Sequence, residues 1–319
     1  MRSARHLKGN KMGEGHFFSV IVTTYNRRKL LRSCIDSLLS QDYPAEKYEI
    51  ILVDDGSRDG TGEMVRSVFG GRVRYLYQDN SGWAAARNLG LTQSRGEIVI
   101  FIDDDCRASP DWLALYEAAY LAHPEVGGVA GRVDAGPEMN LAGKIRFRGH
   151  VAIFNELNAP LGTRYESPGY VNFCYGANRS YRREVLGEAP FDARLWYFED
   201  HDLDLRLKEQ GVLIFYDPRV VVWHHYRLSA WGRIRADFYY ARSEVLFRAR
   251  RPDFSKPRSV RPAGWRSPFR LFRDFPEEPL KAKLSYLIVQ ALCRAARAFG
   301  AFQGRRELKR FCPGKANMI

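Results

Sequence analysis

Three consecutive aspartates, Asp103, Asp104 and Asp105, are the strongest chemical signal in this sequence of 319 residues, and they directly follow an apolar run. Two carboxylates one residue apart at a strand end can hold one divalent cation that prefers oxygen ligands, with positions left open for a diphosphate. The same pattern can also be a solvated turn or the cap of a following helix. A second acidic pair, Asp54 and Asp55, ends another apolar run and favours the interpretation as a binding site.

A later acidic cluster has the spacing of a helix. If Glu199 begins a helix, it shares one face with Asp202, while Asp200 and Asp204 share another. The aromatic residues before this cluster could form the wall of a pocket and raise the pKa of a carboxylate that acts as a base. The alternative is a solvated first turn with acids placed favourably in the helix dipole. His224 ends an apolar run, where a neutral imidazole could bind a metal or have only a structural role.

Alternating strand-like and helix-like segments must position these groups. Apolar runs predict strands at residues 17–24, 48–53, 73–77, 97–102 and 126–130. Helical periodicity predicts helices between them, at residues 28–40, 63–69 and 84–94 and from Ser109 onward. This alternation predicts βαβ units, and therefore a mostly parallel sheet with helices on both faces. Ligands bind such sheets beyond the carboxyl ends of the strands, where the polar clusters occur.

The pattern changes after about residue 134. Further strands are predicted at residues 170–175, 212–216 and 220–223, with a helix at 198–208. The helix predicted at residues 84–94 opens with small residues, Gly82 and Ala84 to Ala86, just before Arg87. Small residues would let a nucleotide approach the backbone and Arg87 could meet its charge, although close packing of helix on sheet explains them equally well.

Composition excludes several classes of protein. Hydrophobic residues make up 45% of the chain, enough to bury a core, so a disordered protein is excluded. Five cysteines without a CxxC pair exclude a disulfide scaffold or a zinc ribbon and favour a reducing compartment. No apolar run approaches the roughly 18 residues that a bilayer requires. Residues 1–16 lack the apolar core of a signal peptide, so we expect a cytoplasmic protein.

Seven segments, in this order, resemble glycosyltransferase family 2, the inverting nucleotide-sugar transferases of the GT-A fold. The segments are VIVTTYNR (20–27), VDDGS (53–57), SGWAAARNLGL (81–91), IVIFIDDDC (98–106), YGANRSYRRE (175–184), FEDHDLDLRL (198–207) and VVVWHHYR (220–227). Each segment alone is a weak signal, but together they span most of residues 17–250. The resemblance implies a GT-A fold with a Rossmann-like sheet.

On the donor side, the resemblance implies a nucleotide pocket lined by Thr23, Tyr25 and Asn26, with Asp55 on the base and Arg87 beside the nucleotide. Asp103 and Asp105 resemble the two acids of the family's DxD motif, and Asp104 its variable middle residue. Asp105 would bind the metal, Mn²⁺ or Mg²⁺, together with His224, and Asp103 would lie nearer the ribose.

On the acceptor side, Asp200 is at the position of the catalytic base, and Glu199 would contact the acceptor. Gly176 and Asn178 resemble the segment near the donor sugar. Arg179 and Ser180 depart from the family's pattern, because a small or apolar pair is expected there. This departure concerns the acceptor side of the site.

The C-terminal part of the chain is basic. The formal net charge is +13, and most of the excess follows Arg227. Apolar residues recur at helical spacing over residues 231–245 and 280–302, with Lys and Arg between them. Such a helix is typical of a membrane surface, although it could also fold back on the catalytic domain or contact a second subunit. We expect a leader at 1–16, a catalytic domain at 17–250 (halves 17–133 and 134–250) and a basic helical extension at 251–319.

The sequence therefore predicts a metal-dependent inverting glycosyltransferase that uses a nucleotide sugar, with UDP favoured. Its acceptor would be a glycan or a lipid-linked intermediate of cell-surface polysaccharide synthesis, reached at the inner face of the membrane. The alternatives are a sugar nucleotidyltransferase or a non-catalytic relative of the same fold that binds nucleic acid or membrane. The acidic edge of the predicted site argues against nucleic acid as a partner.

Overall fold

The computed structural model describes residues 15–137, 139–225, 229–251 and 272–311. These residues form two compact units. The first contains residues 15–134, 158–193 and 200–224, and the second contains the described residues of 135–157, 194–199 and 225 onward. Nearly all of the predicted leader lies outside the described residues. The predicted boundary at residue 250 falls inside the second unit.

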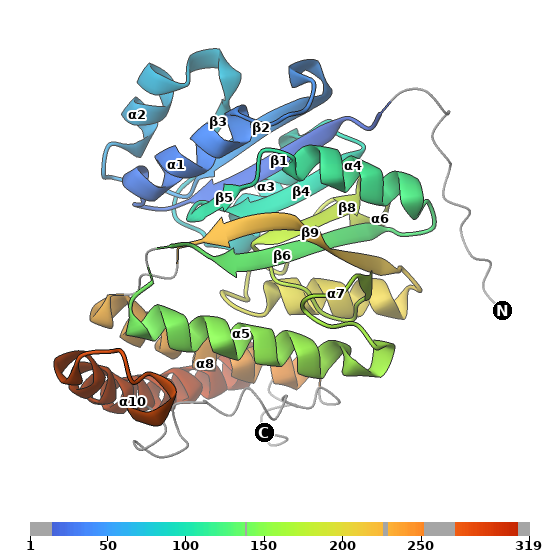
Figure 1. Ribbon diagram of the computed structural model, residues 1–319. Coiled ribbons are helices and arrows are strands. Elements are labelled where there is room, and N and C mark those ends of the chain that lie inside the picture. The colour runs from blue at the N-terminus through green and yellow to red at the C-terminus, as the bar shows by residue number, and fades with distance from the viewer. Residues whose placement is uncertain (1–14, 138, 226–228, 252–271, 312–319) are drawn as a thin grey trace. The chain divides into compact units, whose positions relative to one another are not determined.

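A mixed sheet is the centre of the first unit (Figure 1), and its described strands run in the order β3-β2-β1-β4-β8-β6-β9-β5, with β7 paired to β9. The first four strands along the chain are parallel to their neighbours: β1 (Phe18–Thr24), β2 (Tyr48–Asp54), β3 (Arg74–Tyr77) and β4 (Ile98–Asp103). The later strands extend this sheet beside β4: β5 (Cys106–Ala108), β6 (Gly128–Ala135), β7 (Gly169–Tyr170), β8 (Asn178–Arg182) and β9 (Ile214–His224). The pairs β4–β8, β6–β8, β5–β9 and β7–β9 are antiparallel.

Helices cover both faces of the parallel strands. Apolar residues of α1 (Arg28–Leu39), α2 (Thr61–Val68) and α4 (Trp112–Ala122) share one buried cluster with β1, β2 and β4. On the other face α3 (Trp83–Gln93) packs on Ile51 and Val53. Gly90 allows this close approach, because a Cβ there would lie 2.5 Å from the Ile21 side chain. The prediction of an α/β fold with helices on both faces is confirmed.

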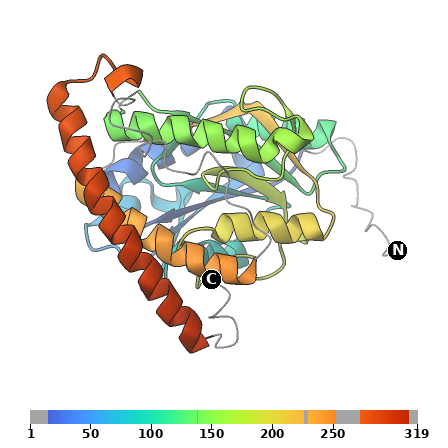
Figure 2. The ribbon, with the colours of Figure 1, turned by 90° about the horizontal axis from the view of Figure 1, so that it is seen from below.

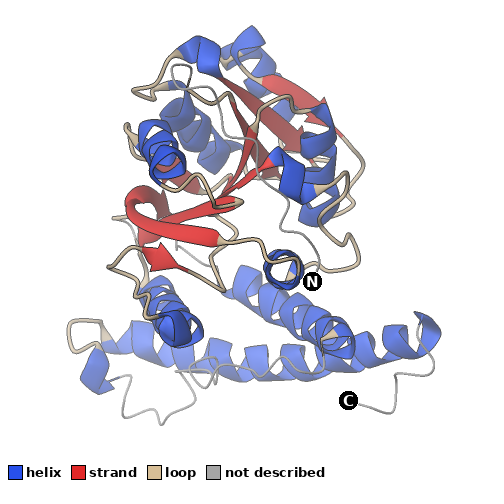
Figure 3. Cartoon of the chain, turned by 90° about the vertical axis from the view of Figure 1, so that its right-hand side faces the viewer, coloured by secondary structure: helices blue, strands red, loops and turns tan. Residues whose placement is uncertain are grey.

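Figure 3 shows the helices in blue and the strands in red. The other described elements of the first unit are α7 (Glu199–Glu209) and several shorter ones. The shorter ones are α6 (Arg183–Leu186) and the 3₁₀ turns at Ala45–Lys47, Gly70–Arg72 and Ala159–Leu161.

The predicted strand at residues 170–175 is wrong beyond Tyr170, where β7 ends. The Asn158 side chain bonds the backbone N–H groups of Asn172 and Phe173 and the carbonyl of Phe173, so this segment is fixed as a loop. The strands predicted at 212–216 and 220–223 are a single strand, β9. Asp217, between the two predicted strands, lies inside β9 and pairs with Arg219.

Three long helices form most of the second unit: α5 (Leu141–Asn158), α8 (Ala230–Arg250) and α10 (Leu280–Phe311). Helices α8 and α10 lie side by side (Figure 2). Gly300 and Gly304 make this contact close, because a Cβ at either position would collide with backbone oxygens of α8. Arg242 on α8 makes two hydrogen bonds to Glu307 on α10, at 2.8 and 2.7 Å.

Candidate active site

The aspartates at the end of β4 share an arginine from the loop after β1. Arg27 donates through Nη1 to Asp104 Oδ1 at 3.0 Å and to Asp105 Oδ2 at 2.7 Å. Asp104 is buried and also accepts a 2.6 Å hydrogen bond from the Thr24 hydroxyl. Burial raises the pKa of Asp104 to about 7, although Arg27 opposes this effect. One guanidinium thus holds two neighbouring carboxyl groups together.

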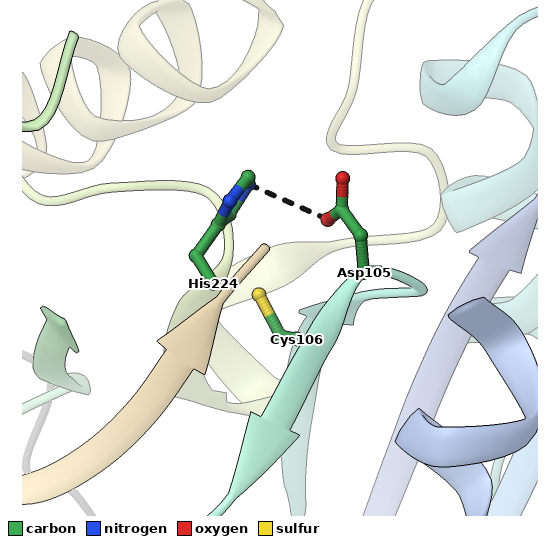
Figure 4. Close-up of side chains that lie close together, drawn as sticks. All are labelled: Asp105, Cys106 and His224. Atoms are coloured by element: carbon green, nitrogen blue, oxygen red, sulfur yellow. Dashed lines mark ion pairs between the residues drawn. The ribbon is translucent and has the colours of Figure 1, made fainter. Parts of the chain in front are cut away.

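Asp105 and His224 come together through the pairing of β5 with β9. In this register Cys106 lies opposite His224, and the His224 Nε2 atom is 3.4 Å from Asp105 Oδ1 (Figure 4). One possible ligand atom each from Asp105, Cys106 and His224 lie within 4.8 Å of one another. Burial raises the pKa of the Cys106 thiol well above its usual value. A sulfur ligand is soft and suits Zn²⁺ or Cu⁺ better than Mn²⁺ or Mg²⁺. A carboxylate and an imidazole remain, and this pair fits one Mn²⁺ or Mg²⁺ ion with open positions.

Arg87 links the DxD acids to the predicted base. It is buried on α3 and donates from Nη2 to Asp103 Oδ1 at 3.0 Å. Gly176 lies between Arg87 and Asp200, because a Cβ at this glycine would be 3.6 Å from Arg87 Nη2 and 2.9 Å from Asp200 Oδ2. The fold therefore brings Asp103, Arg87, Gly176 and Asp200 to one place.

Asp200 lies in the first turn of α7. Its Oδ1 atom accepts a 2.8 Å bond from the His201 backbone N–H, and its Oδ2 atom is 3.4 Å from Arg179 Nη2. Burial works to raise the pKa of Asp200, but the positive charge of Arg179 leads the opposing effects and the pKa is lowered overall. The carboxylate is therefore ionised at neutral pH, as a general base requires.

Asp55 holds together the loop that precedes α3. Its carboxylate accepts four hydrogen bonds, from the side chains of Gln78 and Asn80 and from the backbone N–H groups of Ser81 and Gly82. These bonds use the acceptor capacity of a carboxylate, which is about four hydrogen bonds. Recognition of a base by Asp55 remains a prediction, and it would require one of these bonds to be exchanged.

Three other predicted donor-side residues lie at the end of β1 or just after it. Thr23 and Tyr25 are half-buried, and Asn26 is exposed. Asn26 has a φ of 53° and joins the neighbouring loop, because its N–H donates to the Ser57 hydroxyl and its side-chain oxygen accepts from the Arg58 N–H. This local geometry keeps the ends of β1 and β2 together.

Asn178 lies inside the sheet rather than on its edge. Its amide donates to the carbonyls of Arg132 and Val220, and its oxygen accepts from the side chains of Trp112 and Tyr116. Its predicted contact with the donor sugar would replace one of these bonds. Glu199 is buried and directly precedes Asp200 in α7, and its contact with the acceptor remains a prediction.

Reasoning from the sequence missed four residues at this site: Thr24, Arg27, Cys106 and Arg179. All four lie inside the quoted motifs, and Cys106 could have been found as the neighbour of Asp105. The departure at Arg179 was visible, but no pattern in the sequence indicated that its side chain reaches Asp200.

Residues 19–189, more than half of the chain, match the protein-family model for glycosyl transferase family 2. The chain belongs to glycosyl transferase family 2. It is 42% identical over 100 residues to glycosyltransferase AglE of Haloferax volcanii, a match that covers 30% of this chain and 33% of AglE. The chain thus covers about a third or less of the first curated relatives that it matches.

Two solved structures resemble the fold along most of the chain. The mannosyltransferase PcManGT from Pyrobaculum calidifontis, in complex with GDP-Man and Mn²⁺, has a TM-score of 0.57 and 21% identity, covering 95% of this chain and 89% of that one. TarS 1–349 from S. aureus, in complex with UDP, has a TM-score of 0.53 and 20% identity, covering 92% and 90%. At these identities the likeness establishes the fold.

Proposed function

We propose that this chain is an inverting glycosyltransferase that moves a sugar from a nucleotide sugar, UDP favoured, to an acceptor hydroxyl. The observation that carries the proposal is the ionised Asp200 carboxylate beside Arg87 and Asp103. Family membership supports it, and PcManGT and TarS were crystallised with GDP-Man and UDP. The acceptor that we propose is a glycan or a lipid-linked intermediate of cell-surface polysaccharide synthesis.

The proposed reaction is a direct displacement. Asp200 accepts the proton of the acceptor hydroxyl as its oxygen bonds the anomeric carbon, on the face opposite the departing diphosphate. The bond from this carbon to the diphosphate breaks, so the configuration inverts without an enzyme nucleophile. Arg87 and Arg27 offer positive charge near the acids. A Mn²⁺ or Mg²⁺ ion on Asp105 and His224 would neutralise charge on the leaving diphosphate.

Calorimetric titration of UDP, GDP and dTDP, each with and without Mn²⁺, tests the donor site. We expect tight binding of one nucleotide, UDP first, only when the metal is present. A sugar nucleotidyltransferase would instead bind the nucleoside triphosphate and release pyrophosphate. Failure of all three nucleotides to bind would contradict the proposal and favour a non-catalytic relative.

We also propose that α10 rests on an anionic membrane surface. None of the described helices is long and apolar enough to cross a bilayer. The face of α10 that packs on α8 includes the small or polar side chains of Cys293, Arg297, Gly300 and Gly304. Tyr286 and Leu308 are buried, but six other large apolar residues are exposed, Ile288 by 64% for example, and one of them, Phe299, also contacts Phe238 of α8. These six recur three, four or seven residues apart: Leu280, Leu284, Ile288, Leu292, Phe299 and Phe302. We call these six residues the apolar stripe.

Charge favours lipid over a second copy of the chain as the occupant of this stripe. Lys281 lies at one end of the stripe and Arg305 and Arg306 at the other, all exposed, whereas Glu307 is paired with Arg242. Two copies would bring like charges together, but anionic headgroups attract them, and the stripe can enter the acyl boundary.

Sedimentation with vesicles tests this surface. We expect the protein to pellet with phosphatidylcholine vesicles that contain phosphatidylglycerol, and Ile288→Glu to bind about tenfold more weakly, because the transfer energy of one large aliphatic side chain is lost. Ser285→Glu is the matched control, since it adds the same charge at an exposed polar position of α10. Equal binding by both variants would contradict the proposal, and a dimer that Ile288→Glu splits would assign the stripe to a second copy.

A further inference from the structure

A buried arginine lies directly behind the proposed base. The Arg179 side chain on β8 is 1% exposed. Its guanidinium donates to the backbone oxygens of Cys174 at 2.5 Å, Tyr175 at 3.3 Å and Asp200 at 3.3 Å, and to the Tyr181 hydroxyl at 3.0 Å. These bonds connect the loop before β8, the strand itself and the first turn of α7. The pattern of the family leads one to expect a small or apolar side chain here.

The same guanidinium faces two carboxylates. Arg179 Nη1 is 3.2 Å from Asp204 Oδ1, and Arg179 Nη2 is 3.4 Å from Asp200 Oδ2. The two acids differ in their access to water, because the Asp204 side chain is 1% exposed and the Asp200 side chain 21%. Asp204 also accepts a 2.8 Å bond from the Tyr181 hydroxyl. Asp204 is thus an interior partner of Arg179, whereas Asp200 presents its carboxylate outward.

The charges of the ionisable groups around Asp200 favour its ionised form. Burial raises the pKa of Asp204 to about 6, even though Arg179 opposes this effect. Burial lowers the pKa of His201 to about 4, so this imidazole is neutral at pH 7. Burial also raises the pKa of the Cys174 thiol, which therefore carries no charge. The full cations that act on Asp200 are then Arg179 and, from α3, Arg87.

We infer that Arg179 is a positioning residue for the proposed general base. It donates hydrogen bonds to the backbone oxygen and to one carboxylate oxygen of Asp200, and so keeps that carboxylate charged and oriented. This inference rests on the proposed function. Arg179 need not touch the donor or the acceptor, because it acts from the interior side. The partly exposed carboxylate of Asp200 remains available to a hydroxyl from the other side.

The pH dependence of turnover tests this role. The probe is hydrolysis of UDP-glucose or GDP-mannose, whichever nucleotide binds with Mn²⁺, with water as the acceptor. In Arg179→Met the acidic limb of the kcat/KM profile should move to higher pH by about one to three pH units, because an opposite charge next to a carboxylate lowers its pKa by that amount. Arg179→Lys keeps the charge but not the fork of donors, so it should lower kcat and leave the limb in place.

Two further variants separate this role from a loss of folding. Arg179→Met leaves the buried Asp204 without the cation that it pairs with. The double variant Arg179→Met with Asp204→Asn removes both charges, and its acidic limb should move by the same amount as in Arg179→Met. Asp204→Asn alone should keep the limb of the wild type. Arg182→Met is the matched control on the same strand, because Arg182 bonds backbone oxygens of Val126 and Pro124 instead.

The outcomes distinguish the two proposals. If Asp200→Asn hydrolyses the donor as fast as the wild type, the assignment of the base fails and Arg179 has no base to position. If Asp200→Asn is inactive but the limb stays in place in the double variant, the role of Arg179 is overturned and the base stands. Mn²⁺-dependent nucleotide binding should be unchanged in every Arg179 variant.

Discussion

Two clusters in the first unit each place one arginine against two carboxylates, and they differ in their access to water. Arg27 bonds Asp104 and Asp105 with its side chain 41% exposed, whereas Arg179 bonds Asp200 and Asp204 with its side chain 1% exposed. An exposed guanidinium can leave its partners for water when a ligand competes for them. A buried one has no such alternative. From this difference we expect the Arg27 cluster to exchange partners when a ligand binds, and the Arg179 cluster to stay paired.

The largest effects should come from the acid that each cluster contributes to the reaction. Asp105→Ala should abolish Mn²⁺-dependent nucleotide binding, and Asp200→Asn should retain binding but lose transfer by about 10²–10⁴-fold, the range typical of a general base. Calorimetry with Mn²⁺ and a transfer assay measure the two separately. Asp36→Ala is the control, because Asp36 is exposed on α1 and pairs only loosely with Arg32. Donor binding of wild-type strength in Asp105→Ala would remove the metal assignment.

Stability should separate the two arginines next. Arg179→Met should lower the free energy of unfolding by about 3–5 kcal/mol, because it leaves a buried carboxylate without its partner. Arg27→Met should lower it less, by about 1 kcal/mol, because the Arg27 side chain is 41% exposed and water can take its place beside the carboxyl groups. Urea unfolding followed by circular dichroism measures both. Equal losses for the two variants would show that the difference in burial does not affect how much each arginine contributes to the free energy of unfolding.

The smallest effect should appear in metal affinity. If Arg27 competes with the cation for Asp105, Arg27→Met should bind Mn²⁺ in the absence of nucleotide more tightly, by at most about fivefold, since a half-exposed ion pair is worth about 1 kcal/mol. Titration of Mn²⁺ followed by electron paramagnetic resonance measures this change. Arg32→Met, on the exposed side of α1, should have no effect. Weaker Mn²⁺ binding in Arg27→Met would mean that Arg27 supports the ion and does not compete with it.

The sequence was a reliable guide to the parallel half of the sheet. Strands β1, β2 and β4 are short apolar runs that are largely buried on both faces, whereas β3 is a half-exposed edge strand. A helix with buried apolar residues separates each of these four strands from the next. That local pattern determines both the elements and their polar ends, so Asp103 and Asp105 could be identified. The same reasoning failed at residues 171–175, where the long-range bonds of Asn158 override the local preference for a strand.

The partners of the site residues were less accessible from sequence. His224 meets Asp105 through the register of β5 with β9, but β5 has only three residues and no periodicity to reveal it. Arg179 reaches Asp200 from a strand where neighbouring residues alternate between the two faces of the sheet, and only the folded chain determines which face an arginine occupies. The sequence also did not determine what the apolar residues of α10 face, because helical spacing alone does not distinguish a stripe that packs on protein from one that faces solvent.

The pairing of Cys106 with His224 has a consequence for folding during synthesis on the ribosome. The DxD segment is complete early, but the strand that carries its imidazole is synthesised more than a hundred residues later. A nascent chain that has folded only β1 to β4 has its aspartates and lacks His224, the second ligand of the proposed metal site. The order of synthesis would thus delay the assembly of this proposed site until β9 has joined the sheet.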